Sequence, residues 1–128
     1  MLVEAIVLLG VSRAVVRALP FRFLAPHLGR QNRETQRTIA AAQQQIASRA
    51  AKAIAMISPH TPWDSNCLAQ AVAGKLMLRM RSVPTTLYMG LKHEEAALKA
   101  HAWLRAGERL VTGGSIASQY NVVACYGK

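Results

Sequence analysis

Two residues of this sequence carry side chains suited to nucleophilic catalysis, Cys67 and His101. Cys67 is expected in the first turn of a helix, where the positive end of the helix dipole stabilises a thiolate. His101 follows about thirty residues later in an expected strand, where an imidazole can serve the thiol as general base. The pair has the parts of a cysteine nucleophile and its base, although a small core cysteine and a hydrogen-bonded strand histidine explain the same residues.

Three nearby residues have both a functional and a structural interpretation. Asn66 could donate to an oxyanion hole together with the Cys67 N–H, but a solvated asparagine in a first helical turn fits equally well. Asp64 is expected to cap the helix, because an anion beside the thiol would oppose thiolate formation. Trp103 shares a strand face with His101 and is either a wall of the cleft or a core indole.

Neither a metal nor another cofactor is expected. His27, His60 and His93 do not combine with Cys125 in any spacing typical of metal ligands. We expect Cys125 to be unbridged to Cys67, because a disulfide would consume the nucleophile and a reducing cytosol favours free thiols.

The elements that must position these residues are helical in the first half of the chain. Apolar residues recur at three- and four-residue steps from Leu2 to Leu19 and from about Arg33 to Ile57, which predicts two amphipathic helices. Residues 21–29 contain a proline and a glycine and are expected to form an ordered loop. A third helix is expected to begin just before Cys67.

In the second half the apolar residues alternate with a period of two, which predicts strands. They run through residues 83–91, 98–105, 108–112 and 119–126, and the middle two are expected to form a hairpin with its turn at Ala106-Gly107. Helices followed by an antiparallel sheet predict an α+β fold. A length of 128 residues predicts a single domain, residues 1–128.

Charge and hydropathy narrow the classes of function. The chain has 16 Lys and Arg against 6 Asp and Glu, a formal charge of +10. The basic residues are scattered and aromatic residues are few, so an acidic protein or peptide is favoured over nucleic acid as a partner. No apolar run reaches the roughly 20 residues of a membrane span, and no secretory signal pattern is visible, so a cytoplasmic protein is expected.

The sequence around the catalytic pair resembles a known family. PWDSNCLAQAVAGKLMLRMRSVPTTLYMGL, followed by AHAWLRAGERLVTGG, is similar to the stand-alone leader peptidases of lasso-peptide biosynthesis. These are cysteine proteases with a transglutaminase-like, papain-related fold. The opening EAIVLLGVSRAVVRALPFRFLAPHLG and the closing YNVVACYG also resemble the ends of that domain, so the likeness covers nearly the whole chain.

The resemblance implies hydrolysis of one peptide bond, which removes the leader from a ribosomally made precursor peptide. A partner ATP-dependent cyclase would then close a macrolactam on the new amine, and a small leader-binding protein would deliver the precursor. Cys67 would match the nucleophile and His101 the general base. The alternatives are a non-catalytic basic adaptor for an acidic partner or nucleic acid, and a transglutaminase-like acyl transferase with an amine acceptor.

The third member of the family's Cys-His-Asp triad is missing, because no Asp follows His101. With a turn at Ala106-Gly107, Thr112 would pair with His101 and its hydroxyl would orient the imidazole. Glu108 or Asn121 could substitute for it, or the enzyme could work as a dyad. A hydroxyl cannot stabilise an imidazolium as a carboxylate does, which puts the efficiency of the site in doubt.

Overall fold

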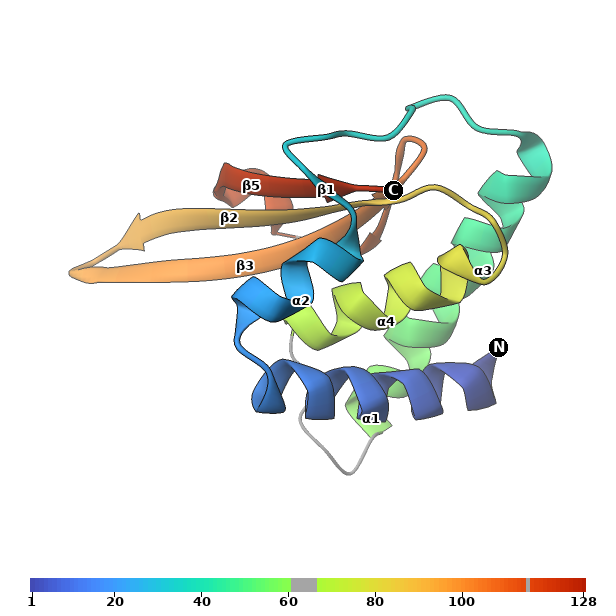
Figure 1. The fold of residues 1–128 in the computed structure, drawn as a ribbon, viewed down its shortest axis with the longest axis horizontal. Coiled ribbons are helices and arrows are strands. Elements are labelled where there is room, and N and C mark those ends of the chain that lie inside the picture. The colour runs from blue at the N-terminus through green and yellow to red at the C-terminus, as the bar shows by residue number, and fades with distance from the viewer. Residues whose placement is uncertain (61–66, 115) are drawn as a thin grey trace.

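The computed structural model of the chain describes residues 1–60, 67–114 and 116–128, which form helices and one sheet (Figure 1). The helices are α1 (Leu2–Ala18), α2 (Phe21–Leu28), α3 (Ala41–Ile57) and α4 (Cys67–Arg79), with short 3-10 helices η1 (Ser58–His60) and η2 (Ala117–Gln119). The strands are β1 (Arg30–Gln31), β2 (Thr86–Glu94), β3 (Ala97–Ala106), β4 (Arg109–Thr112) and β5 (Asn121–Gly127). The described α-helices all precede β2 to β5, and only the two-residue β1 lies among them, between α2 and α3. The predicted α+β class is confirmed.

The sheet has the order β1-β5-β2-β3-β4, and its described strand pairs are antiparallel. The helices cover one face, and the chain that leads into α3 crosses the other (Figure 1). Along β3, Ala102 and Leu104 belong to the large core beneath the helices, whereas Trp103 belongs to a small second cluster. Since side chains alternate along a strand, His101 and Trp103 share the face that is turned away from the helices.

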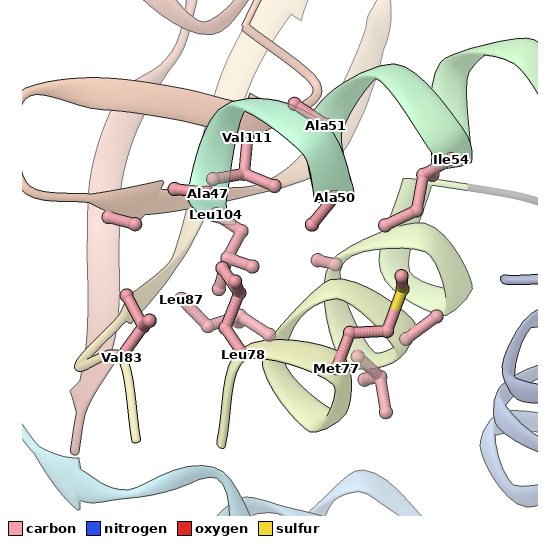
Figure 2. Packing of buried hydrophobic residues seen from close by; sticks show 14 of the residues in the cluster. Ala47, Ala50, Ala51, Ile54, Met77, Leu78, Val83, Leu87, Leu104 and Val111 are labelled. Carbon is pink, nitrogen blue, oxygen red and sulfur yellow. The ribbon is translucent and has the colours of Figure 1, made fainter. Parts of the chain in front are cut away.

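Small residues allow the helices to pack closely on the sheet (Figure 2). Ala47 and Ala50 of α3 are fully buried, together with Leu104 on β3. Gly74 of α4 has no side chain, and a Cβ there would come within 2.9 Å of the Leu104 side chain. The contact between α4 and the sheet therefore depends on the absence of bulk at Gly74.

The helix predicted for residues 2–19 is confirmed, but the ordered loop predicted for 21–29 is wrong. Residues 21–28 form α2, with Pro26 inside it. Leu24 and Leu28 lie four residues apart on α2 and are both buried. Packing of this apolar face outweighs the single helical hydrogen bond that Pro26 removes.

The long helix predicted from about Arg33 begins only at Ala41. The residues before it are extended because side chains of the sheet take their backbone groups. The Thr35 N–H donates to Thr86 Oγ1 at 2.8 Å, and Arg105 donates to the Thr35 carbonyl at 2.8 Å. The helix then starts where the Ala40 N–H donates to the Gln43 side chain at 3.0 Å.

Candidate active site

Cys67 is the first described residue of α4, and its thiol is free and partly exposed. Its side chain packs against the core beneath the sheet. A group at this end of a helix lies near the positive end of the helix dipole, which favours an anion. Asp64, expected as a cap, and Asn66, expected as an oxyanion donor, lie outside the described residues.

His101 lies near the middle of β3, opposite Gly90 of β2, and only 8% of its surface is exposed. Its ring is stacked on Trp103, with 5.6 Å between the centroids, and Tyr120 lies 5.1 Å away on a tilted plane. A Cβ on Gly90 would lie 2.7 Å from the Trp103 indole, so only glycine leaves room for this aromatic row. Trp103 is 5% exposed and is therefore a core indole.

One hydrogen bond orients the His101 ring. Nε2 lies 2.9 Å from the carbonyl oxygen of Gly113. A carbonyl oxygen can only accept, so Nε2 carries the proton and, in the neutral ring, Nδ1 keeps the lone pair. Nδ1 is therefore the nitrogen that can take a proton from a thiol.

Thr112 does not face the imidazole, and the pairing predicted for it is wrong. It pairs with Leu104, because the turn lies at Gly107-Glu108 and the register shifts between Leu104 and Arg105. A β-bulge of this kind displaces every later partner by a residue. The Thr112 hydroxyl is buried and has no hydrogen-bond partner in the part of the chain that the structure describes.

The two substitutes considered for the missing Asp are also not bonded to His101. Glu108 is exposed in the hairpin turn, and Asn121 is exposed at the start of β5, opposite Leu91. Within the described ranges, the Gly113 carbonyl is the only hydrogen-bond partner of the imidazole. Sequence reasoning missed this group because every residue has a carbonyl and no residue type marks it.

The structure joins Cys67 and His101 by no hydrogen bond. Cys67 packs against the core on the helix side of the sheet, whereas the His101 ring lies on the other side with Trp103. The end of α4 that bears Cys67 nevertheless points toward the His101 end of β3. Lys75, just beyond the middle of the helix, donates to the Thr85 carbonyl at 3.0 Å, and β2 starts at the next residue, Thr86, opposite Arg105. The two groups can therefore meet only around the edge of the sheet.

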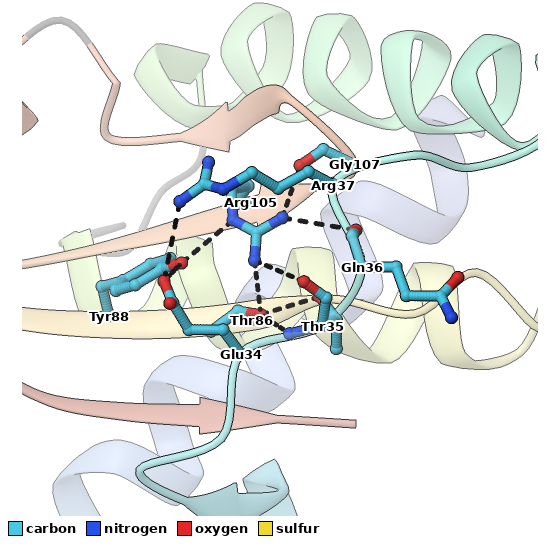
Figure 3. A network of polar contacts seen from close by, with 8 residues as sticks. All are labelled: Glu34, Thr35, Gln36, Arg37, Thr86, Tyr88, Arg105 and Gly107. Atoms are coloured by element: carbon cyan, nitrogen blue, oxygen red, sulfur yellow. Dashed lines mark hydrogen bonds and ion pairs between the residues drawn. The ribbon is translucent and has the colours of Figure 1, made fainter.

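A buried arginine fixes the other end of the histidine's strand (Figure 3). Arg105 is 3% exposed and donates to the Gly107 carbonyl at 2.5 Å and to the Tyr88 hydroxyl at 3.0 Å. The Tyr88 hydroxyl also donates to Glu34, and burial followed by this hydrogen bond raises the pKa of Tyr88. These groups bond to one another and, within the described residues, not to His101, so we assign them to structure.

An antiparallel sheet with helices on one face, a cysteine at a helix start and a histidine on a neighbouring strand define a class of α+β domain with the parts of a thiol active site. The family model of the transglutaminase-like superfamily matches residues 11–125. The chain therefore belongs to the transglutaminase-like superfamily, in which cysteine-type peptidases and acyl transferases are common. No curated protein and no solved structure matches the chain significantly.

Over residues 1–60, 67–114 and 116–128, no helix combines the length and the apolar character that crossing a bilayer requires.

Proposed function

We propose that this protein is a cytoplasmic cysteine peptidase that removes the leader from a ribosomally made lasso precursor peptide before macrolactam formation. Membership of the transglutaminase-like superfamily supports thiol-based acyl chemistry. The observation that carries the proposal is the orientation of His101, whose Nε2–H bond to Gly113 keeps Nδ1 available as a base. The leader peptidase assignment rests on the resemblance of the sequence around Cys67 and His101 to that family.

The reaction would proceed in two halves. For this step the two groups must first meet around the edge of the sheet. Nδ1 of His101 then takes the proton from Cys67 Sγ, and the sulfur attacks the carbonyl carbon of the scissile bond. The C–N bond breaks and the imidazolium returns its proton to the leaving amine. Water then attacks the thioester, releases the carboxylate of the leader and restores the thiol. A small leader-binding protein and an ATP-dependent cyclase are the proposed partners on either side of this step.

The test uses the two cysteines as a matched pair. Both are free and partly exposed, but burial raises the pKa of the Cys125 thiol, which keeps it protonated. Precursor cleavage, followed by mass spectrometry with and without the leader-binding protein, should fall by about 10³-fold or more in Cys67→Ala. It should remain near the wild-type rate in Cys125→Ala. Cleavage by a folded Cys67→Ala variant would overturn the mechanism.

The same assay separates the alternatives. With glycinamide in excess, a peptidase yields mainly the free carboxylate, whereas an acyl transferase yields mainly the amide. A protein that cleaves no precursor under any of these conditions, yet binds an acidic partner, would be the non-catalytic adaptor instead.

A further inference from the structure

Within the described residues, no strand pairs with one edge of β3 along more than half of its length. β3 runs from Ala97 to Ala106, but β4 pairs with it only from Leu104 to Ala106. On the opposite side of the hairpin, β5 follows β2 as far as Leu91. No strand in the described part of the chain lies beside residues 97–103, and the β2–β3 hairpin extends well beyond the helices (Figure 1). The edge of β3 next to His101 therefore has no paired strand within the described residues.

The register shows which backbone groups face that edge. Glu94 and Ala97 close the β2–β3 hairpin around a two-residue turn, so every second residue from Ala97 onward exchanges hydrogen bonds with β2. Leu98 and Ala100 lie between these residues and direct their N–H and C=O groups outward. Both are exposed, Leu98 at 58%. An apolar edge without an outward proline or bulge is a template for another strand.

The free edge ends at the imidazole. Gly113 follows β4 with a φ of +67°, and a Cβ there would lie 2.7 Å from the Ala102 carbonyl oxygen and 2.8 Å from His101 Nε2. Gly113 therefore occupies the edge beside Ala102, in line with β4, and the open stretch starts directly after it. A peptide that pairs with Leu98 and Ala100 would therefore have one end next to the His101 imidazole, which is bonded to the Gly113 carbonyl.

We propose that the peptide substrate binds as an added strand along Leu98 and Ala100 of β3, which brings its scissile bond to His101. This rests on the proposed peptidase function and adds how the substrate is held. Continuity of the edge with His101 identifies the occupant as the substrate. The edge from Leu98 to Ala102 is about 13 Å long, enough for roughly four extended residues. Binding through main-chain groups tolerates many side chains.

The first test modifies the substrate backbone. Binding of the precursor peptide to the full-length Cys67→Ala variant is measured by fluorescence anisotropy, so the result does not depend on cleavage. Single N-methyl groups are moved residue by residue through the four positions next to the scissile bond. Each lost hydrogen bond should weaken binding about three- to tenfold. We expect this loss at alternate positions only, and equal or absent effects at all four positions would overturn the proposal.

The second test changes the protein. Leu98→Pro and Ala100→Pro remove outward N–H groups and leave the β2 ladder intact. Each should raise KM for precursor cleavage by about three- to tenfold while the rate of Cys67 alkylation by iodoacetamide stays unchanged. Val123→Pro is the matched control, because Val123 is an exposed bulge residue on the opposite edge of the sheet.

The outcomes separate the two proposals. A wild-type protein that binds the peptide with alternating sensitivity to N-methylation but never cleaves it would refute the peptidase and retain the added strand. Normal cleavage with a KM that Leu98→Pro does not change would refute the added strand alone. A dimer that Leu98→Pro dissociates in sedimentation would assign the edge to a second copy and overturn the proposal.

Discussion

At His101 the orienting group is a backbone carbonyl, where a carboxylate is usual in the family that the sequence resembles. The Gly113 oxygen accepts from Nε2 at 2.9 Å and so selects the tautomer. A carbonyl carries no full charge, so it stabilises the imidazolium less than an aspartate would. The imidazole is therefore oriented at Nε2 as a triad histidine would be, but without the negative charge of a carboxylate.

Gly113→Ala tests this role. The new Cβ would lie 2.8 Å from Nε2, and the φ of +67° disfavours any side chain by about 1 kcal/mol. We expect kcat for precursor cleavage to fall at least about tenfold because the ring is displaced. Gly107→Ala is the matched control, since its φ is +60° but its Cβ would meet Ile39 instead. Equal losses of kcat in both variants would show that strain, and not the ring, is responsible.

Among the elements, α4 carries the proposed nucleophile at one end and is bonded to α1 near the other. Arg81 follows α4, and its two terminal guanidinium nitrogens donate to the two carboxylate oxygens of Glu4 on α1, at 2.6 and 2.5 Å. Arg81 also donates to the Met77 carbonyl at 3.0 Å. Behind this pair, Ala5 and Leu9 of α1 are fully buried. α1 therefore supports the helix that begins at Cys67.

Glu4→Gln should weaken this support. The hydrogen bond from Arg81 lowers the pKa of Glu4 below its ordinary 4.5. A depressed pKa stabilises the fold above about pH 4.5, and this stabilisation is lost as the pH falls through the lower folded value. Because both side chains are partly exposed, we expect a loss of about 1 kcal/mol at pH 7.

Urea unfolding at pH 7, 5 and 3 measures this effect. The difference between wild type and Glu4→Gln should shrink toward zero at pH 3. Glu95→Gln, on an exposed turn, is the control and should change stability little at any of these values. A Glu4→Gln deficit that stays constant with pH would mean that shape, and not charge, holds α1 to α4.

For the molecule as a whole, a buried lysine places an electrostatic cost in the core. Lys75 of α4 is 1% exposed and donates to the Thr85 carbonyl and hydroxyl at 3.0 and 2.9 Å. Burial, and then the nearby cations Arg79 and Lys128, lower the pKa of Lys75 from 10.5 to about 7. A chain with a formal charge of +10 thus buries one of its amines without a carboxylate within salt-bridge distance in the described residues.

Lys75→Met should stabilise the protein in a pH-dependent way. Below about pH 7 the amine is charged in both states, so folding bears the full cost of burying it. From about pH 7 to 10.5 only the unfolded state keeps the proton, so wild-type stability rises with pH. At about 1.4 kcal/mol per pKa unit the shift corresponds to about 5 kcal/mol. Because the variant also loses the two hydrogen bonds to Thr85, it should gain roughly 2–4 kcal/mol at pH 6.

This gain should fade toward zero near pH 10. Denaturant unfolding from pH 6 to 10 checks it, with Lys52→Met on the exposed side of α3 as the control. If Lys75→Met and Lys52→Met show the same dependence on pH, the amine of Lys75 is charged in the fold at every pH and the interpretation is wrong.

The sequence by itself determined the parts that depend on near neighbours. Apolar periods of three to four and of two residues correspond to α1 and to the four longer strands, and α4 begins at Cys67 within the described residues. The two residues proposed for the chemistry, Cys67 and His101, were also identified by type and context. These features lie in the order of side chains along the chain, which the sequence states directly.

Only the tertiary structure decided the register and the partners. A bulge between Leu104 and Arg105 moved Thr112 away from His101, and one carbonyl, at Gly113, took its place. Arg105 held residues 35 and 36 extended where periodicity favoured a helix. The physical reason is the same in each case. A hydrogen bond from a side chain to a backbone carbonyl, or a pairing between strands, outweighs a local preference, and the backbone atoms involved carry no residue signature from which it could be predicted.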